Sequence, residues 1–337
     1  MANYNAMLLL SLILSTSIMV LGQSNGDIGV CYGLIGDNLP RPKEIVSLYQ
    51  KLGIKKMRIF QPYPEVLEAL RGSGIQLVLG TLNQDIPFIA SGEDAAREWF
   101  MSRVQPYVND IDILYISVGN EVIPGEFSES ILPAMENLQK VLDSNNLGTK
   151  ATTVVHAILL GTSFPPSEGK FSDKSGPFIT EILKFLSSQK TPLLVNLYPY
   201  FPYAENPTEI PLDYALLSST DTFVQDGPLS YTNLLDAMLD AFYWAVEKEG
   251  VNDVNIVISE SGWPHGGNGD LTTSELASIY NSNFVKRVES GNGTPKRPQA
   301  KIEGYIFALL DENLKEPGVE RNWGLFTPTL QPNYVLF

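Results

Sequence analysis

The feature that most constrains the fold of this chain is a series of eight short apolar runs, separated by longer segments with helical periodicity. Most runs are apolar at nearly every position rather than at alternate positions, which is typical of strands buried on both faces of a parallel sheet. The runs are Ile28 to Tyr32, Lys56 to Phe60, Ile75 to Leu79, Ile113 to Val118, Thr152 to Ile158, Leu193 to Tyr198, Asn255 to Ser259 and Ile302 to Leu309. This alternation predicts an α/β protein.

Eight strand and helix repeats favour a single closed (β/α)8 TIM barrel over an open doubly wound sheet. Between the runs, apolar residues such as Leu235, Leu239 and Phe242 fall on one face of an expected amphipathic helix. An open sheet would need a ligand loop at its switch point, where the turn after the first run offers only Gly33 and Gly36. That turn lacks the glycine-rich dinucleotide fingerprint, so we expect the barrel.

The longest connection follows the sixth run, where the segment from Pro199 to Pro228 is broken up by five prolines. Connections of this length inside a compact domain are usually functional. In a barrel this segment would lie at the carboxyl ends of the strands, so we expect it to form a loop along one wall of the active site.

The first 22 residues are predicted to be a secretory signal peptide, followed by one barrel domain over residues 23–337. Met7 to Leu21 is apolar but short for a membrane span, and it ends at the small residue Gly22. An uncleaved membrane anchor is the alternative. We therefore expect a secreted protein without a membrane segment after cleavage, with Asn292 in the one glycosylation sequon, followed closely by Pro295.

Composition narrows the chemistry that such a barrel can perform. With 38 acidic and 23 basic side chains, the net charge of −15 disfavours nucleic acid as a partner. Cys31 is the one cysteine, so an internal disulfide and a cysteine-rich zinc cluster are excluded. Only two histidines are present, which argues against a multi-histidine metal centre. We expect no metal and no cofactor, and acid/base chemistry carried by carboxylates.

Two glutamates stand directly after strand-like runs, where a barrel places its catalytic groups. Glu121 follows Ile113 to Asn120, and Glu260 follows Asn255 to Ser259. Two carboxylates without a histidine or metal partner are the equipment of glycoside hydrolysis, in which one carboxylic acid donates a proton and the other carboxylate is ionised. Aspartic-protease chemistry would instead need Asp-Thr/Ser-Gly turns, which the chain lacks. A carboxyl gap of about 5 to 5.5 Å would give retention and about 6.5 to 9.5 Å inversion, and the sequence leaves this open.

The segment from Ile256 to Gly267, which contains Glu260, reads IVISESGWPHGG. It closely resembles the signature of the family 17 glycoside hydrolases, the plant endo-β-1,3-glucanases. The resemblance covers essentially the whole chain after the leader, in the right order. It continues through Ile28 to Gly33 (IGVCYG), Tyr115 to Val122 (YISVGNEV), Asn196 to Phe201 (NLYPYF) and Phe307 to Phe326 (FALLDENLKEPGVERNWGLF).

The resemblance implies residue roles at the matching positions. Glu121 would be the general acid/base and Glu260 the nucleophile of a retaining enzyme. Asn120 is similar to an asparagine that contacts the sugar 2-hydroxyl, and Tyr198 to a tyrosine that hydrogen-bonds the nucleophile. A charged cluster that the family keeps beside the catalytic pair matches Glu312, Lys315 and Glu320. A structural ion-pair network supporting the last loop is the alternative for this cluster.

Aromatic residues at or just after strand ends are candidates for stacking on pyranose faces, with ordinary packing as the alternative. They are Tyr32, Tyr198, Phe201, Trp263, Trp323 and Phe326.

The chain departs from the family pattern at positions expected on the same face of the barrel. His265 stands where the signature usually has Ser, Thr or Asn, Phe60-Gln61 replaces Tyr-Asp, and Trp323 replaces Phe. These changes bear on the substrate subsites rather than on the catalytic glutamates. His265 is either an exposed loop histidine or a group that titrates near the site.

The resemblance implies an acidic, extracellular enzyme of the plant cell-wall space that cleaves internal β-1,3 linkages of glucans, and we expect it to be secreted and monomeric. Two alternatives stay open. One is a mixed-linkage β-1,3-1,4-glucanase, which the same family contains. The other is a catalytically silent glucan-binding wall protein, against which the presence of both glutamates argues.

Overall fold

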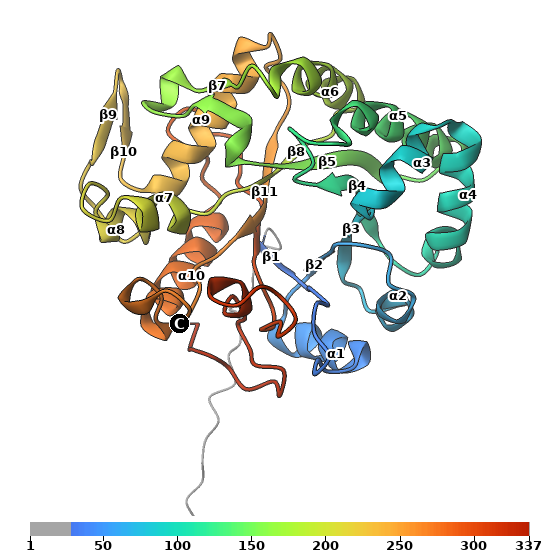
Figure 1. Ribbon diagram of the computed structural model, residues 1–337, viewed down its shortest axis with the longest axis horizontal. Helices are drawn as coiled ribbons and strands as arrows, with labels where there is room; N and C mark the ends of the chain where they lie inside the picture. The colour runs from blue at the N-terminus through green and yellow to red at the C-terminus, as the bar shows by residue number, and fades with distance from the viewer. Residues whose placement is uncertain (1–27, 337) are drawn as a thin grey trace, which may run out of the picture.

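A computed structural model describes residues 28–336, in which eight parallel strands close into a barrel (Figure 1). The strand order is β1-β12-β11-β8-β5-β4-β3-β2, and β1 pairs with both β12 and β2 to complete the ring. The predicted TIM barrel is therefore confirmed. The predicted signal peptide, residues 1–22, lies outside the described residues. The barrel strands are β1 Ile28–Cys31, β2 Lys56–Ile59, β3 Gln76–Gly80, β4 Ile113–Asn120, β5 Lys150–His156, β8 Leu193–Asn196, β11 Ile256–Ser261 and β12 Gly304–Ile306.

Each barrel strand coincides with one of the eight apolar runs, because buried parallel strands need apolar side chains on both faces. Helices surround the strands (Figure 1), and their apolar faces pack inward, as in α9, where Leu235, Leu239 and Phe242 are buried. The principal helices are α1 Pro42–Leu52, α2 Pro64–Leu70, α3 Ile86–Ala90, α4 Glu93–Arg103, α5 Ser128–Ser144, α6 Gly176–Gln189, α9 Leu234–Lys248 and α10 Ser274–Glu289.

Particular residues at helix starts and at one close strand–helix contact explain the local structure. Asn233 caps α9 by accepting a hydrogen bond from the backbone N–H of Asp236, and Thr273 caps α10 in the same way. Gly304 of β12 lets α10 approach closely, since a Cβ there would lie 2.6 Å from the ring of Phe284. Burying a phenylalanine of this kind stabilises the fold by about 1.5 to 3 kcal/mol.

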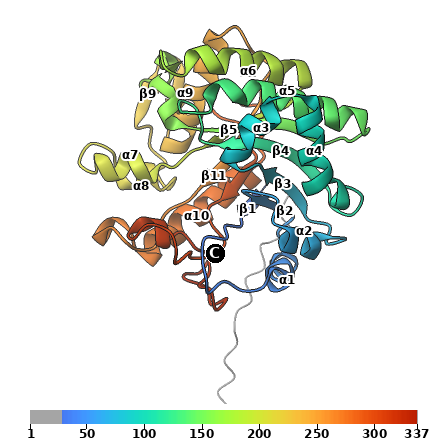
Figure 2. The same cartoon turned by 45° about the vertical axis from the view of Figure 1, so that its right-hand side comes forward.

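The connection after the sixth barrel strand is more ordered than the expected loop. It contains α7 Tyr200–Glu205, α8 Leu212–Ala215 and a hairpin of β9 Val224–Asp226 and β10 Leu229–Tyr231. The expected loop is instead partly regular, because Pro199 and Pro211 directly precede α7 and α8, and Pro202 lies in the first turn of α7, where the fixed φ of proline is tolerated. Pro207 and Pro228 lie in turns. Figure 2 shows α7 and α8 projecting from the barrel. A second small sheet, β6 Leu160–Thr162 with β7 Lys170–Phe171, covers α9.

No helix within residues 28–336 is long and apolar enough to cross a membrane. The core is continuous from the barrel interior to the helix layer, and Cys31 is buried in it as a free thiol. The carboxyl ends of the strands are left to carry the polar groups described next.

Candidate active site

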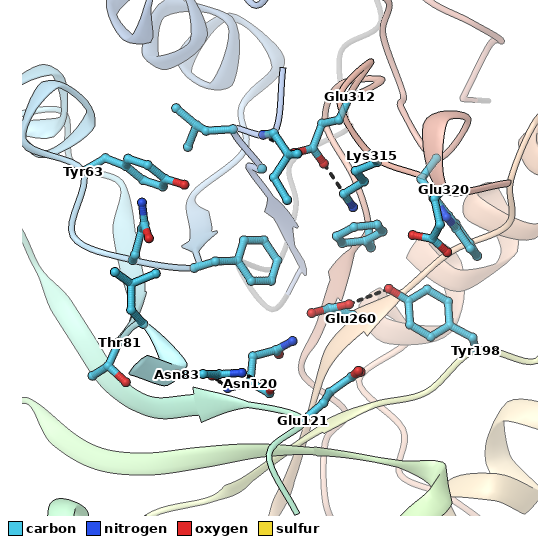
Figure 3. Close-up of a pocket in the computed structure, with 18 of the residues that line it drawn as sticks. Tyr63, Thr81, Asn83, Asn120, Glu121, Tyr198, Glu260, Glu312, Lys315 and Glu320 are labelled. Atoms are coloured by element: carbon cyan, nitrogen blue, oxygen red, sulfur yellow. Dashed lines mark hydrogen bonds and ion pairs between the residues drawn. The ribbon is translucent and has the colours of Figure 1, made fainter. Parts of the chain in front are cut away.

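Glu121 and Glu260 both point into one pocket at the carboxyl ends of β4 and β11 (Figure 3). Glu121 is placed by an abrupt turn of the chain, in which Gly119 has φ 74° and Glu121 itself has φ 55°. A left-handed conformation is uncommon for a residue with a Cβ and costs on the order of 1 kcal/mol. The turn is held by a hydrogen bond from the Glu121 N–H to the carbonyl of Val154 (3.0 Å).

Glu260 is surrounded by groups that stabilise its ionised form. Arg58 Nη1 lies 2.5 Å from Glu260 Oε1, and the Tyr198 hydroxyl donates to Oε2 at 2.6 Å. Burial, followed by the charge of Glu260, raises the pKa of Tyr198 well above its usual value, so the phenol keeps the proton it donates. A buried carboxylate with a guanidinium and a phenol as donors is suited to remain a charged nucleophile.

Glu121 has surroundings of the opposite kind. Asn196 Nδ2 donates to Glu121 Oε1 at 2.7 Å, and no cation forms an ion pair with this carboxyl within residues 28–336. Desolvation by the pocket walls raises the pKa of Glu121, and the nearby charge of Glu260 raises it further, although the residue is open to solvent on one side. The hydrogen bond from Asn196 lowers that pKa only in part. Glu121 is therefore suited to hold a proton.

A network of amide side chains connects the two carboxyl groups. Asn120 Oδ1 accepts from Arg58 Nη2 at 2.7 Å and from Asn196 Nδ2 at 3.3 Å. Asn196 Oδ1 in turn accepts from the hydroxyl of Ser259 at 2.7 Å. The backbone of Asn120 is held by Asn83, which accepts from its N–H (2.9 Å) and donates to its carbonyl (3.2 Å). These bonds fix the two carboxyl groups relative to one another.

The pocket has a volume of about 450 Å³, and its two sides are formed by different loops. Phe60, Gln61 and Tyr63 line it on the side of the loops after β1 to β3. Tyr198, Phe201 and Trp323 line the other side, with the rings of Tyr198 and Trp323 5.0 Å apart. Aromatic faces beside amide groups are the lining that sugar rings require, because pyranoses are apolar on their faces and polar at their edges.

The pocket is also lined by the three charged residues named from the resemblance, Glu312, Lys315 and Glu320 (Figure 3). Their contacts differ. Glu312 is 3% exposed, accepts from the Ile35 N–H at 2.7 Å and pairs with Lys315 Nζ at 3.2 Å. These contacts fit the structural alternative, since they attach the last loop to the loop after β1. Glu320 points into the pocket, and no hydrogen bond or ion pair holds its carboxylate among the described residues.

Three of the six predicted aromatic residues do not line the pocket. Tyr32, Trp263 and Phe326 are buried and contribute no surface to the pocket, so the expectation that they stack on sugar rings is corrected. Trp263 illustrates the reason, because its indole N–H donates to the carbonyl of Leu271 (2.9 Å) and its ring packs near Tyr280. A position after a strand end does not decide whether a ring turns into the mouth or behind it.

The family departures have different structural consequences. Phe60 and Gln61 both line the pocket, in agreement with their expected effect on subsites. His265 does not line it and is not an exposed loop residue, because its side chain is 15% exposed and its Nε2 lies 3.0 Å from Asp311 Oδ1.

The residues that sequence reasoning missed are Arg58, Asn196 and Asn83. Arg58 left a readable signal, since a cation inside a short strand that is otherwise buried needs a carboxylate partner. Asn196 and Asn83 left a weaker one, being amides that end or follow apolar runs.

Comparisons with known proteins agree with this geometry. The profile of the Glycosyl hydrolases family 17 matches residues 28–336. A "Probable glucan endo-1,3-beta-glucosidase" of Arabidopsis thaliana is 47% identical, covering 92% of this chain and 90% of its own. A basic vacuolar isoform of glucan endo-1,3-beta-glucosidase from Nicotiana plumbaginifolia is 42% identical, covering 96% and 89%. A solved structure described as one of two plant β-glucan endohydrolases with distinct substrate specificities is 41% identical, with a TM-score of 0.88 and coverage of 91% and 99%. Together with the barrel and its glutamate pair, these matches show that the chain belongs to family 17 of the glycosyl hydrolases.

Proposed function

We propose that this protein hydrolyses internal β-1,3-glucosidic linkages of β-glucans by a retaining double displacement, with Glu121 as the acid/base and Glu260 as the nucleophile. The observation that carries the proposal is the unequal environment of the two carboxyl groups. Glu260 has a guanidinium and a phenol as partners, whereas Glu121 has an amide and a raised pKa. One carboxylate and one carboxylic acid facing one pocket are what glycoside hydrolysis needs.

In the first step, Glu260 attacks the anomeric carbon while Glu121 gives its proton to the departing glycosidic oxygen. The carbon–oxygen bond breaks and a glycosyl ester forms on Glu260. In the second step, Glu121 takes a proton from water, the water oxygen attacks the same carbon, and the ester bond breaks. Asn120 lies beside both groups, with its Oδ1 bound to Arg58, which leaves its amide nitrogen for a sugar hydroxyl.

A neutral polysaccharide fits the pocket and the charge of the chain. The net charge of −15 repels polyanions, and the lining combines aromatic rings with amides. The names of the relatives specify β-1,3-glucan, whereas the solved neighbour is one of a pair with distinct specificities. Digesting laminarin and lichenan side by side separates the two linkage preferences. Release from lichenan with none from laminarin would overturn the β-1,3 assignment, and binding of glucan without any turnover would establish the silent alternative.

The nucleophile is tested with Glu260→Ala. We expect kcat on laminarin to fall by at least about 10⁴-fold, because the covalent step is lost. Added azide should restore turnover and yield the α-glucosyl azide, since azide reaches the anomeric carbon from the face that the carboxylate vacated. Glu129→Ala, an exposed glutamate in the first turn of α5, is the matched control and should retain full activity. Undiminished hydrolysis by the Glu260 variant would remove this residue from its role.

We further propose that the protein is secreted as a monomer after removal of residues 1–22. The apolar segment from Met7 to Leu21 supports export, whereas a relative named as a vacuolar isoform shows that family members reach more than one destination. Amino-terminal sequencing of protein from the culture medium should begin near Gln23. Light scattering after gel filtration should give the mass of one chain.

Asn292 is proposed to carry an N-glycan in the secreted protein. Its side chain is exposed in the loop after α10, whereas the Thr294 hydroxyl is buried and accepts from the Arg297 N–H at 3.1 Å. Because the hydroxyl is covered after folding, the sugar would have to be attached during synthesis. A mass shift on treatment with peptide N-glycosidase, absent in Asn292→Gln, is the expected result.

A further inference from the structure

One wall of the pocket includes a loop of the chain after β12, residues 312–323, which we call the wall loop. It carries Glu312, Lys315, Glu320 and Trp323 into the pocket. The chain leaves and returns at the same place, since the Ala308 N–H donates to the Trp323 carbonyl at 3.0 Å and the Leu325 N–H donates to the Ala308 carbonyl at 2.9 Å. The position of this base decides where the loop places its side chains.

A single carboxylate closes the base of the wall loop. Asp311, directly before the loop, accepts the N–H of Gly324, directly after it, at 2.9 Å. Its other oxygen accepts from Asn333 Nδ2 at 2.7 Å. His265 Nε2 lies 3.0 Å and 3.2 Å from the two Asp311 oxygens, and it donates to them in the tautomer that carries the ring proton on this nitrogen.

His265 belongs to the segment that follows the nucleophile strand, five positions after Glu260. This segment lies directly against the wall loop. The His265 N–H donates to the carbonyl of Asn322 at 2.8 Å, and a Cβ on Gly267 would lie 2.4 Å from the carbonyl carbon of Gly318. The imidazole is thus the side-chain connection between the segment after Glu260 and the base of the wall loop.

The wall loop in turn contacts Tyr198, the residue that donates to Glu260. The rings of Trp323 and Tyr198 are 5.0 Å apart, and the Tyr198 hydroxyl donates to Glu260. A shift of the loop would therefore change both the sugar-facing wall and the contact that orients the nucleophile.

We propose that His265 is a positioning residue, which through Asp311 sets the place of the wall loop, and with it Trp323 and Glu320, relative to Glu260. It touches no substrate and transfers no proton. Its kinetic consequence rests on the proposed function, whereas its structural consequence does not.

The test uses the full secreted chain with His265→Ala and His265→Gln. Glutamine can place an amide donor near Asp311 and serves as the conservative replacement. Gln76→Ala is the control, because Gln76 Nε2 donates to Asp112 at 2.8 Å at the start of β3, the opposite end of the barrel. Each variant is compared by hydrogen exchange of peptides covering residues 312–323 and by the kinetics on a laminari-oligosaccharide.

In His265→Ala, we expect exchange in the wall loop to accelerate about tenfold, the effect of losing one hydrogen bond to a carboxylate, with other segments unchanged. KM should rise about three- to tenfold while kcat changes less, because Glu121 and Glu260 remain in place. His265→Gln should recover most of both effects, and Gln76→Ala should show neither.

Three outcomes would overturn the proposal: unchanged exchange in His265→Ala, a loosened loop without a change in KM, or no recovery in His265→Gln. If wild type hydrolyses no glucan but the exchange pattern appears as expected, the connection stands and the proposed function fails.

Discussion

Two buried cations on β2 have side chains on the same face of the strand, but their partners lie toward opposite ends of the barrel. Lys56 and Arg58 are two residues apart, so their side chains share the face that points into the barrel. Lys56 Nζ pairs with Glu303 Oε1 at 3.0 Å beside Tyr305, whose hydroxyl donates to the same oxygen at 3.2 Å. Arg58 pairs with Glu260 at the carboxyl end, where the pocket opens.

The difference indicates that one cation of the strand supports the fold and the other supports the pocket. Lys56 makes one ion pair in a closed layer at the bottom of the barrel. Arg58 divides its donors among Glu260, Asn120 and the Ser259 carbonyl, and two of these partners, Glu260 and Asn120, line the pocket. Active sites of such barrels lie at the carboxyl ends of strands, whereas the opposite end supports the fold. Variants of the two ion pairs should therefore affect different measurements.

Among the variants that compare the two ends of the barrel, the largest effect is expected for Arg58→Lys. Lysine keeps the charge but cannot reach Glu260 and Asn120 together, since it lacks the planar fork of donors. We expect kcat on laminarin to fall on the order of 10²-fold, as when one preorganised donor is removed. Steady-state kinetics beside a thermal melt give the answer. A loss of stability with full activity would place Arg58 with Lys56 as a structural residue.

A smaller effect is expected for Tyr198→Phe, which removes one donor from Glu260 and leaves the ion pair to Arg58. A hydrogen bond to a charged group contributes about 1.5 to 3 kcal/mol. Because the ion pair to Arg58 still holds the carboxylate, we expect the lower end of that range, about a tenfold fall in kcat. The melting temperature should stay close to that of wild type. A variant with wild-type kcat would show that Arg58 alone holds the nucleophile.

The pH profile tests the acid of the pair. Because desolvation and the charge of Glu260 raise the pKa of Glu121, the proton is lost only above the usual range for glutamate, and activity should fall as pH rises through that pKa. His156 lowers the pKa of Glu121, so His156→Asn should move the alkaline limb of kcat/KM to higher pH. A shift toward lower pH would contradict this electrostatic assignment.

The smallest effect on activity is expected for Lys56→Met. The variant leaves Glu303 without its cation in a partly buried site, which should lower the free energy of unfolding by about 1 to 3 kcal/mol. The kcat/KM should change by less than about twofold, because the pocket lies at the other end of the barrel. Chemical denaturation and laminarin kinetics test the two parts. A loss of kcat/KM as large as that of Arg58→Lys would show that the Lys56 ion pair also supports catalysis.

The place of Glu121 and Glu260 in the pocket was predictable because their signal is local. Each follows an apolar run, and barrels collect such positions at one mouth. Arg58 was missed because its meaning depends on Glu260, which is 202 positions away. Its spacing with Lys56 around Met57 also resembles a half-exposed strand, in which cations are ordinary.

The aromatic residues also show that a position after a strand does not decide what a side chain contacts. Tyr198 and Trp263 both follow strands, yet one ring lines the pocket and the other is fully buried. After β11, the ring of Trp263 packs against Tyr200 of α7 and Tyr280 of α10, which cover it. The direction of the chain there is set by packing between distant elements.

By itself, the sequence determined the barrel, its family and the two glutamates, because strand burial and strand-end polarity are written in neighbouring residues. Only the tertiary structure decided which glutamate has a guanidinium and a phenol as partners, which rings line the pocket and what His265 contacts. Those properties depend on charges and surfaces contributed by strands far apart in the chain, and they exist only once the barrel has closed.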